Sequence, residues 1–204
     1  MLSIEDGSRI NIENWWNEEP EDGYCVDRHA GAIILEHLNE DYNVETEENI
    51  GDFRSYYFYS YDPMGNSLDV LDNADAIDSD VCTAIAAIKH SQEWEGVYDI
   101  ADGILYIDRI YIKPEYRGKK LGYIIFPVLV DILSKRKDTI VTIIPQPLHD
   151  MVRDFAKEKT TLKNSFEYKL ALKKMKSFLN AFGFEQLGNS EVWAAAVMDE
   201  GRFS

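Results

Sequence analysis

The chain has 204 residues, of which 45% are hydrophobic and 28% are charged, as in a globular protein large enough for its own core. No apolar run approaches the ~20 residues that a membrane-spanning helix needs. The formal net charge of −16 argues against nucleic acid as a partner. We expect one domain over residues 1–204, with no nucleic-acid and no membrane partner.

The cysteines and histidines give no signal of a metal site. Cys25 and Cys82 are isolated in the sequence, so we expect free thiols in a reducing compartment. The histidines show no pairing at metal-ligand spacing: His29, His37, His90 and His149. The sequence starts with the acidic Met-Leu-Ser-Ile-Glu-Asp and not with a basic, apolar leader, so we expect a cytoplasmic protein.

The charge is distributed unevenly. Residues 109–176 hold 16 of the 21 basic residues against seven acidic ones, a balance of +9 that leaves −25 for the rest of the chain. A basic segment in an acidic protein favours a polyanionic ligand there, although lysine-rich helix surfaces would give the same count. The acidic remainder favours a cationic acceptor, although many proteins are acidic only for solubility.

The N-terminal quarter is strongly acidic, with fourteen acidic and two basic residues in positions 1–50. Trp15-Trp16 indicates an element that ends near Pro20. Residues 29–42 fit a short amphipathic helix, and a strand over part of them fits nearly as well. Residues 45–52 predict a polar connection, and the aromatic residues 53–61 predict a strand.

The next segment has helical periodicity. Apolar residues recur at intervals of three and four over residues 72–90, which predicts a helix, with Asn73 or Asp75 as its N-cap. Residues 96–102 predict a turn or a short strand. Both segments precede the strand that is predicted over residues 104–112.

Residues 104–112 predict a strand that Pro114 ends. We expect its even positions to form one apolar face that also carries Asp108. A glycine-containing turn over residues 117–122 follows, and then a helix in which Pro127 predicts a kink or an early end.

Three further elements follow. Residues 138–144 predict a strand buried on both faces, parallel to the strand over 104–112. Residues 148–165 are polar and irregular. Residues 168–182 predict an amphipathic helix that ends at Gly183, and strands are expected from Phe184 and over residues 192–198.

The turn after the strand over 104–112 is a candidate anion site. A glycine-containing turn that leads into a helix leaves backbone N–H groups unpaired, and the helix dipole adds partial positive charge there. Phosphates are the natural ligands of such a turn. An ordinary β–α turn without a ligand is the alternative.

Residues 107–122, Ile-Asp-Arg-Ile-Tyr-Ile-Lys-Pro-Glu-Tyr-Arg-Gly-Lys-Lys-Leu-Gly, resemble the acyl-CoA signature of the GNAT superfamily of N-acyltransferases. Residues 178–184, Phe-Leu-Asn-Ala-Phe-Gly-Phe, resemble a second family motif, although Leu179 stands where the family often has a general-acid tyrosine. Together with residues 72–88 and 143–148, these segments are similar to a sparsely described bacterial branch of GNAT-like proteins. The resemblance covers residues 70–200, while residues 1–60 form an acidic segment atypical of the family.

The resemblance implies a GNAT-like α/β fold, with a mixed, twisted sheet flanked by helices. It also implies that acetyl-CoA, or another acyl-CoA, is the cofactor. The loop amides would hold the coenzyme A diphosphate and the strand would pair with its pantetheine arm. The positions that this assigns to the cofactor are Ile110, Ile112, Arg117, Gly118, Lys119, Lys120, Leu121 and Gly122.

Lys120 departs from the motif, because the family has its first glycine there. If the backbone takes a positive φ at this position, lysine costs about 1–2 kcal/mol. If the residue is already helical, lysine costs nothing and adds a cation beside the phosphates. We favour the helical alternative.

Asp108 is the candidate general base, since many family members have a carboxylate at the matching position and apolar neighbours would raise its pKa. A carboxylate that is merely paired with a lysine or caps a helix is an equal alternative, and a bulge in the strand would change the face it occupies. Tyr106 and Tyr111 are candidates for orienting the acceptor or protonating sulfur, and both also fit as ordinary strand aromatics.

We expect an acetyl-CoA-dependent N-acyltransferase that acts on an amine, cationic or otherwise, of a small molecule or peptide. The alternative is a non-catalytic module of the same fold that binds acyl-CoA or a protein partner. The sequence leaves the acceptor undetermined and a homodimer open.

Overall fold

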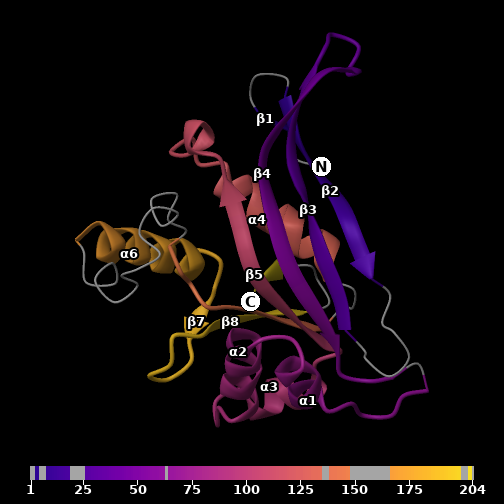
Figure 1. The fold of residues 1–204 in the computed structure, drawn as a ribbon, viewed down its shortest axis with the longest axis vertical. Helices are drawn as coiled ribbons and strands as arrows, with labels where there is room; N and C mark the ends of the chain where they lie inside the picture. Colours follow the sequence, from indigo (N-terminus) through magenta and orange to yellow (C-terminus); the bar gives the residue numbers. More distant parts are fainter. Residues whose placement is uncertain are drawn as a thin grey trace.

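One mixed β-sheet runs through the part of the chain that the structure, a computed structural model, describes: residues 3–4, 8–18, 26–62, 64–134, 138–147, 166–198 and 202–203 (Figure 1). Its nine strands lie in the order β1-β2-β3-β4-β5-β6-β8-β7, with β9 paired to β8. All neighbours are antiparallel except β5 and β6. The strands are β1 Ser3–Ile4, β2 Ser8–Glu18, β3 Val26–Leu38, β4 Val44–Tyr59, β5 Gly103–Ile112, β6 Thr139–Ile143, β7 Glu185–Gln186, β8 Trp193–Met198 and β9 Arg202–Phe203.

Helices flank the sheet on both faces. Short helices follow β4, one long helix connects β5 to β6, and another precedes β7. Their bounds are α1 Val70–Asp75, α2 Ser79–Lys89, α3 Glu95–Ile100, the 3-10 turn η1 Pro114–Tyr116, α4 Gly122–Leu133 and α6 Phe166–Asn180. The expected mixed α/β architecture is therefore present.

The core is divided into two layers by the sheet. Leu105, Ile107 and Val141 pack with α4 and α6 on one side, here called the α4 face. Ile104 and Ile140 pack with α1 and α2 on the other side, here called the α2 face. Because successive strand residues point to opposite faces, β5 and β6 are buried on both sides, as their nearly continuous apolar sequences predict.

The acidic N-terminal quarter is part of the same sheet. The strand hypothesis for residues 29–42 is confirmed by β3, and the helix hypothesis is wrong. The polar connection predicted over residues 45–52 is also wrong, because β4 starts at Val44. Residues 44–48 are exposed in the β3–β4 hairpin, and both faces of the strand contact water there. The sequence therefore lacks the alternation of apolar and polar residues from which a strand is predicted.

The predicted helix over residues 72–90 is two helices. Asp69 caps α1 by accepting from the Leu71 N–H at 3.1 Å, and Asp78 caps α2 by accepting from the Asp80 N–H at 2.8 Å. The proposed caps Asn73 and Asp75 are therefore wrong. Asp78 is extended, with φ −164°, and interrupts the helical path that the apolar periodicity follows on either side. Residues 96–102, predicted as a turn or strand, form most of α3.

The C-terminal half follows the prediction closely. The strands β5, β6 and β8 and the helices α4 and α6 lie where expected, and β5 is parallel to β6. Helix α4 continues through Pro127, where we expected a kink or an end, and buries five side chains that offset the lost hydrogen bond: Ile125, Phe126, Leu129, Val130 and Leu133. Gly183, with φ +76°, ends α6 as predicted. The expectations for Cys25 and for residues 148–165 lie outside the described residues.

Candidate functional site

The sheet opens between its two parallel strands. Strands β5 and β6 pair only from Gly103–Thr139 to Tyr106–Thr142. Strand β5 then continues to Ile112, and over that length its pairing within the described sheet is with β4 alone. One edge of residues 107–112 is therefore available to another extended chain.

A cavity of about 670 Å³ lies at this opening. Its walls come from both core layers, with Ile125 and Leu179 from the α4 face and Tyr106 and Ile144 from the α2 face. The cavity therefore reaches both sides of the sheet. The charged lining residues from the described part of the chain are Arg54, Asp80, Asp108, Arg109, Arg117 and Lys174.

A β-bulge places Asp108 at the centre of this opening. Ser55 of β4 is paired with Ile107 and Arg54 with Arg109, so Asp108 is the extra residue of β5. The bulge exchanges the two faces of the strand. Tyr106 packs on the α2 face, whereas Ile110 packs on the α4 face.

The predicted even-numbered face of β5 is therefore wrong. Ile104 and Tyr106 lie on the α2 face, and Ile110 and Ile112 lie on the α4 face, because the extra residue changes the parity at Asp108. Ile110 and Ile112 still line the cavity, as the predicted cofactor contacts require.

Asp108 is held by an arginine of the neighbouring strand. Arg54 Nε lies 2.5 Å from Asp108 Oδ2, and the Asp108 side chain is 22% exposed. This hydrogen bond is the main cause of a raised pKa at Arg54. The apolar surroundings expected for Asp108 are absent because Arg54 projects from the paired strand. Oδ1 accepts no hydrogen bond from the described residues, which leaves it available to a ligand.

Tyr106 lies beside Asp108 and is only 3% exposed, although it lines the cavity. Its ring stacks on that of Tyr56 at a centroid distance of 6.5 Å. Burial, followed by the negative charge of Asp108, raises the pKa of the Tyr106 hydroxyl. The hydroxyl stays protonated near neutral pH and has no hydrogen-bond partner in the described part of the chain, so it can donate to a ligand.

Tyr111, the other tyrosine predicted for the site, does not line the cavity. Its ring lies under the guanidinium of Arg117, with Cζ 5.3 Å from the ring centroid. Arg117 also donates from Nε to the Ile112 carbonyl at 2.6 Å and lines the cavity. Tyr111 therefore positions Arg117 and does not contact the space where a substrate would lie.

The turn after β5 presents a run of unpaired amides. The backbone N–H groups of Gly118, Lys119, Lys120, Leu121 and Gly122 have no acceptor among the described residues. The flanking amides are bonded, with Arg117 N–H donating to Pro114 at 3.1 Å and Tyr123 N–H donating to Lys120 at 3.0 Å. Five consecutive free donors before a helix have the arrangement that is typical of anion-binding turns.

The backbone at Lys120 is left-handed, with φ +59°, so the favoured helical interpretation is wrong. Leu121 is right-handed, with φ −56° and ψ −31°. A left-handed residue followed by a right-handed one turns successive N–H groups toward a common point, as in an anion-binding nest. Lysine accepts the conformation at a cost of about 1–2 kcal/mol.

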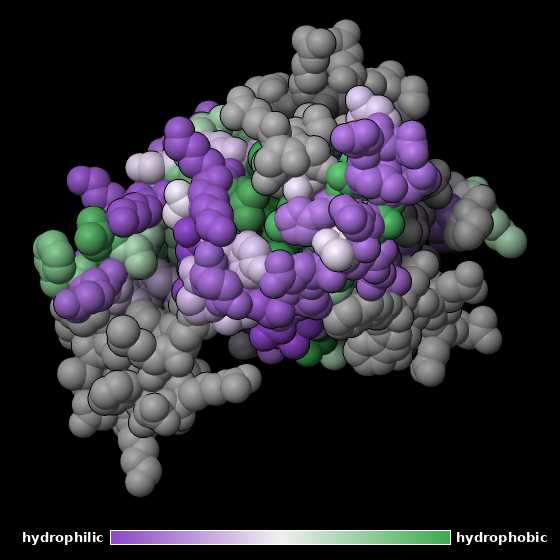
Figure 2. All heavy atoms as spheres, turned by 90° about the horizontal axis from the view of Figure 1, so that it is seen from above, coloured by the Kyte–Doolittle hydropathy of each residue, from purple (hydrophilic) through white to green (hydrophobic). Residues whose placement is uncertain are grey.

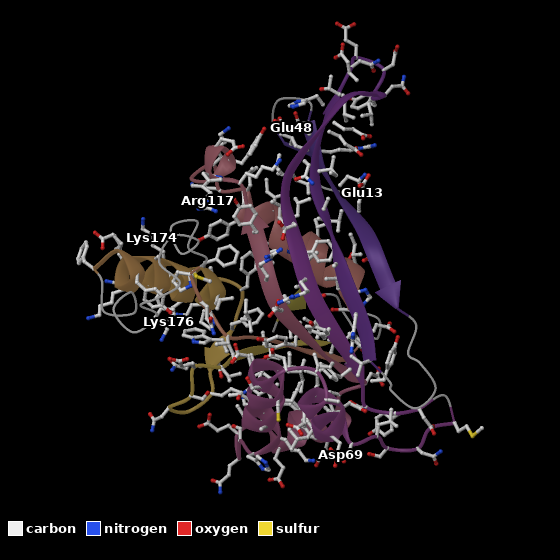
Figure 3. All side chains as sticks on the ribbon, in the orientation of Figure 1. Glu13, Glu48, Asp69, Arg117, Lys174 and Lys176 are labelled. Carbon is white, nitrogen blue, oxygen red and sulfur yellow. The ribbon has the colours of Figure 1, made fainter. Side chains whose placement is uncertain are left out.

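Cations surround this turn. Lys119 Nζ lies 5.0 Å from the centroid of the Tyr116 ring. A hydrogen bond to the Glu48 carboxylate raises the pKa of the Tyr116 hydroxyl to about 12. Lys120 forms no ion pair with a described residue. Arg117 on the turn and Lys174 on α6 project from different elements (Figure 3), and the view from above shows mainly hydrophilic side chains with apolar ones between them (Figure 2).

Arg54 and Asp80, which line the opening, were not identified from the sequence. They come from segments far from the motif, and only the register of β4 and the position of α2 bring them to the cavity. Leu179 was noted as a departure from the motif, and it is a buried wall residue at 2% exposure.

Comparison of the sequence with known protein families and with curated proteins gives no match. Within the described residues, no group of three histidine, cysteine, aspartate or glutamate side chains is arranged to hold a metal ion. None of the described helices has the length and apolar character needed to cross a membrane.

Proposed function

We propose that this protein is a GNAT-like N-acyltransferase that moves an acetyl group from acetyl-CoA to an amine. The observation that carries the proposal is the run of five free amides, Gly118–Gly122, at the mouth of a cavity where parallel strands separate. Such a turn suits a diphosphate, and the adjacent strand edge suits an extended amide-containing chain. Coenzyme A joins these two groups in one molecule.

The donor would lie along the free edge of β5. Its diphosphate would accept from the turn amides and lie near Arg117 and Lys120, while its pantetheine arm would run past Ile112 and Ile110. The thioester would then lie near the bulge at Asp108. The lining of this side is mostly apolar, with Phe126, Phe178 and Leu179 among its side chains.

The chemistry at the bulge is the attack of a neutral amine nitrogen on the thioester carbonyl. The C–N bond forms, the C–S bond breaks, the amine proton passes to Asp108, directly or through water, and the thiolate leaves. An alkylamine has a pKa of about 10.4, so deprotonation at pH 7 accounts for roughly 4.6 kcal/mol of the barrier. The free Oδ1 of Asp108 supports its role as proton acceptor.

The thiolate needs less assistance, because a thiol has a pKa of about 8.5. Leu179 supplies no proton at the position of the family's tyrosine. Tyr106 is a hydrogen-bond donor with a raised pKa, which suits orientation of the acyl carbonyl or acceptor better than proton donation.

The alternative is a non-catalytic module that binds acyl-CoA or a protein partner. Two observations favour it: Leu179 has no titratable group, and Asp108 is already paired with Arg54. The donor side of the cavity is the same in both hypotheses. They differ in whether bound acetyl-CoA is turned over.

Thiol release from acetyl-CoA, measured across a panel of polyamines, amino acids, aminoglycosides and peptide N-termini, distinguishes the two. The enzyme hypothesis predicts thiol release with at least one amine and acetylated product by mass spectrometry. Binding of acetyl-CoA without turnover of any amine supports the module. Failure to bind acetyl-CoA at millimolar concentration rejects the enzyme and the acyl-CoA-binding module, and leaves only a module that binds a protein partner.

A further inference from the structure

The two ends of the cavity differ in charge. Where β5 ends and along α6, the lining includes the cations Arg117 and Lys174. On the α2 face, it includes Asp80, from the first turn of α2. Among the other described charged lining residues, Arg54 pairs with Asp108 and Arg109 pairs with Asp52, both at 2.5 Å.

Asp80 is therefore an unneutralised carboxylate at the edge of the cavity. Its side chain is exposed and forms no ion pair with a described residue. Asp78 lies beside it at the start of α2 and uses Oδ1 to cap the helix. The two aspartates give the α2 side a local excess of negative charge.

Tyr106 provides a second, independent sign of a ligand on this side. Its side chain is almost completely buried and lines the cavity, yet its hydroxyl has no hydrogen-bond partner in the described chain. The hydroxyl oxygen itself is not among the buried polar atoms that lack a partner, so it reaches the open space of the cavity. A ligand in that space can accept a hydrogen bond from it.

We propose that the α2 side of the cavity binds an acceptor that carries two positive charges, one amine near Asp108 and Tyr106 and a second ammonium group held by Asp80. This inference rests on the proposed acetyl transfer and names its substrate class: primary amines with a second cationic group, such as linear diamines and polyamines. The anionic donor and the cationic acceptor would occupy opposite ends of the cavity.

The separation of charges also explains how one cavity accepts both substrates. A donor with several phosphate charges is repelled by Asp80 and attracted to the amide turn and its cations. A dication has the opposite preference. Each substrate is thus directed to its own end, and they meet at the bulge where β5 and β6 part.

The test compares three acceptors of equal chain length at saturating acetyl-CoA: 1,5-diaminopentane, pentylamine and 5-aminopentanoate. The ratio of kcat/KM for the diamine to that for pentylamine is measured in the wild type, in Asp80→Asn and in Asp72→Asn. Asp72 is the matched control, because it is an exposed acid in the first turn of α1 that does not line the cavity.

We expect the wild type to prefer the diamine over pentylamine by about three- to tenfold, the scale of one accessible ion pair with partial burial. 5-Aminopentanoate should be the poorest acceptor. Asp80→Asn should bring the ratio close to one, and Asp72→Asn should keep the wild-type ratio. Equal use of diamine and pentylamine by the wild type, or a preference that survives Asp80→Asn, overturns the inference.

Calorimetric titration with 1,5-diaminopentane separates this inference from the proposed function. If no amine is acetylated but the diamine binds and Asp80→Asn weakens that binding, the cation site stands and the acetyltransferase proposal fails. If amines are acetylated without a preference for the second charge, the proposed function stands and the inference fails. If the diamine is neither acetylated nor bound, the inference fails, whether or not another amine is acetylated.

Discussion

Arg54 and Asp108 join β4 and β5 at the bulge, with 2.5 Å between Arg54 Nε and Asp108 Oδ2. One strand position away, Arg109 and Asp52 make a second cross-strand pair of the same length, with Nη2 2.5 Å from Oδ1. Only the first of these pairs places its carboxylate in the cavity. Removing the Arg109–Asp52 pair therefore measures the effect of losing an ion pair alone. Removing the Arg54–Asp108 pair adds the effect of losing a carboxylate at the candidate reaction centre.

Asp108→Asn should lower turnover by about 10²-fold or more and leave acetyl-CoA affinity within about twofold, because the base is lost and the donor contacts remain. Asp52→Asn removes the matched pair, whose carboxylate lies outside the cavity although Arg109 lines it. It should cost a similar, small amount of stability and retain most of the turnover. Steady-state thiol release, calorimetry and urea unfolding of both variants check this. Equal losses of turnover would show that Asp108 acts only as a structural ion pair.

Gly118→Ala should weaken acetyl-CoA binding through the backbone alone. Gly118 has φ +78°, and an added Cβ would meet nothing within 4 Å, so the change strains the turn without a steric clash. Gly65→Ala is the control, because Gly65 has φ +84°, equally open surroundings and a position outside the cavity. Both variants should lose about 1 kcal/mol of stability. If Gly65→Ala weakened binding as much as Gly118→Ala, the amide turn would not be the site.

Lys120→Gly should increase the free energy of unfolding by about 1 kcal/mol, because glycine adopts φ +59° without the Cβ penalty. Lys119→Gly should lower it, since Lys119 is not among the described residues with positive φ and packs on Tyr116. Urea unfolding of the two variants gives the comparison. The same Lys120→Gly protein should bind acetyl-CoA more weakly with a shallower salt dependence, because one cation is gone. A loss of stability at Lys120 would contradict the strained backbone.

Tyr106→Phe should reduce turnover by about three- to tenfold and change stability by less than about 0.5 kcal/mol, because the hydroxyl has no hydrogen bond to lose within the described structure. Tyr57→Phe is the contrasting change. Its buried hydroxyl is 3.3 Å from Thr139 Oγ1, so its removal should cost about 1 kcal/mol and spare turnover. Thermal unfolding and thiol release measure both effects. A large loss of stability in Tyr106→Phe would indicate a structural partner for that hydroxyl.

The sequence predicts the part of the fold in which periodicity and burial agree. Strand β5, its turn, helix α4 and strand β6 follow from apolar runs bounded by Pro114 after β5, Gly122 at the start of α4 and Pro145 after β6. The helix pattern over residues 72–90 hides a break, because Asp78 lies between two segments that bury the same face against the sheet. The spacing of apolar residues stays the same when the chain turns between two helices that bury the same face. The break at Asp78 therefore leaves no trace in that spacing.

The candidate site was predicted less completely, because register and bulges are properties of strand pairs. The amide turn could be located from its glycines and its position after a strand. The bulge at Asp108 depends on how β4 pairs with β5, and it moved Tyr106 and Ile110 to opposite faces. The contribution of Asp80 depends on the placement of α2 across the sheet, which no pattern within α2 encodes.

The most direct test of the anion turn is a titration of ¹⁵N-labelled protein with coenzyme A, followed through the backbone amide resonances. If Gly118–Gly122 hold the diphosphate, these five amides should shift most, and the Gly65 amide should remain in place as an internal reference. If coenzyme A at millimolar concentration leaves all five resonances unmoved, the turn does not bind the cofactor and the proposed acyl transfer is contradicted.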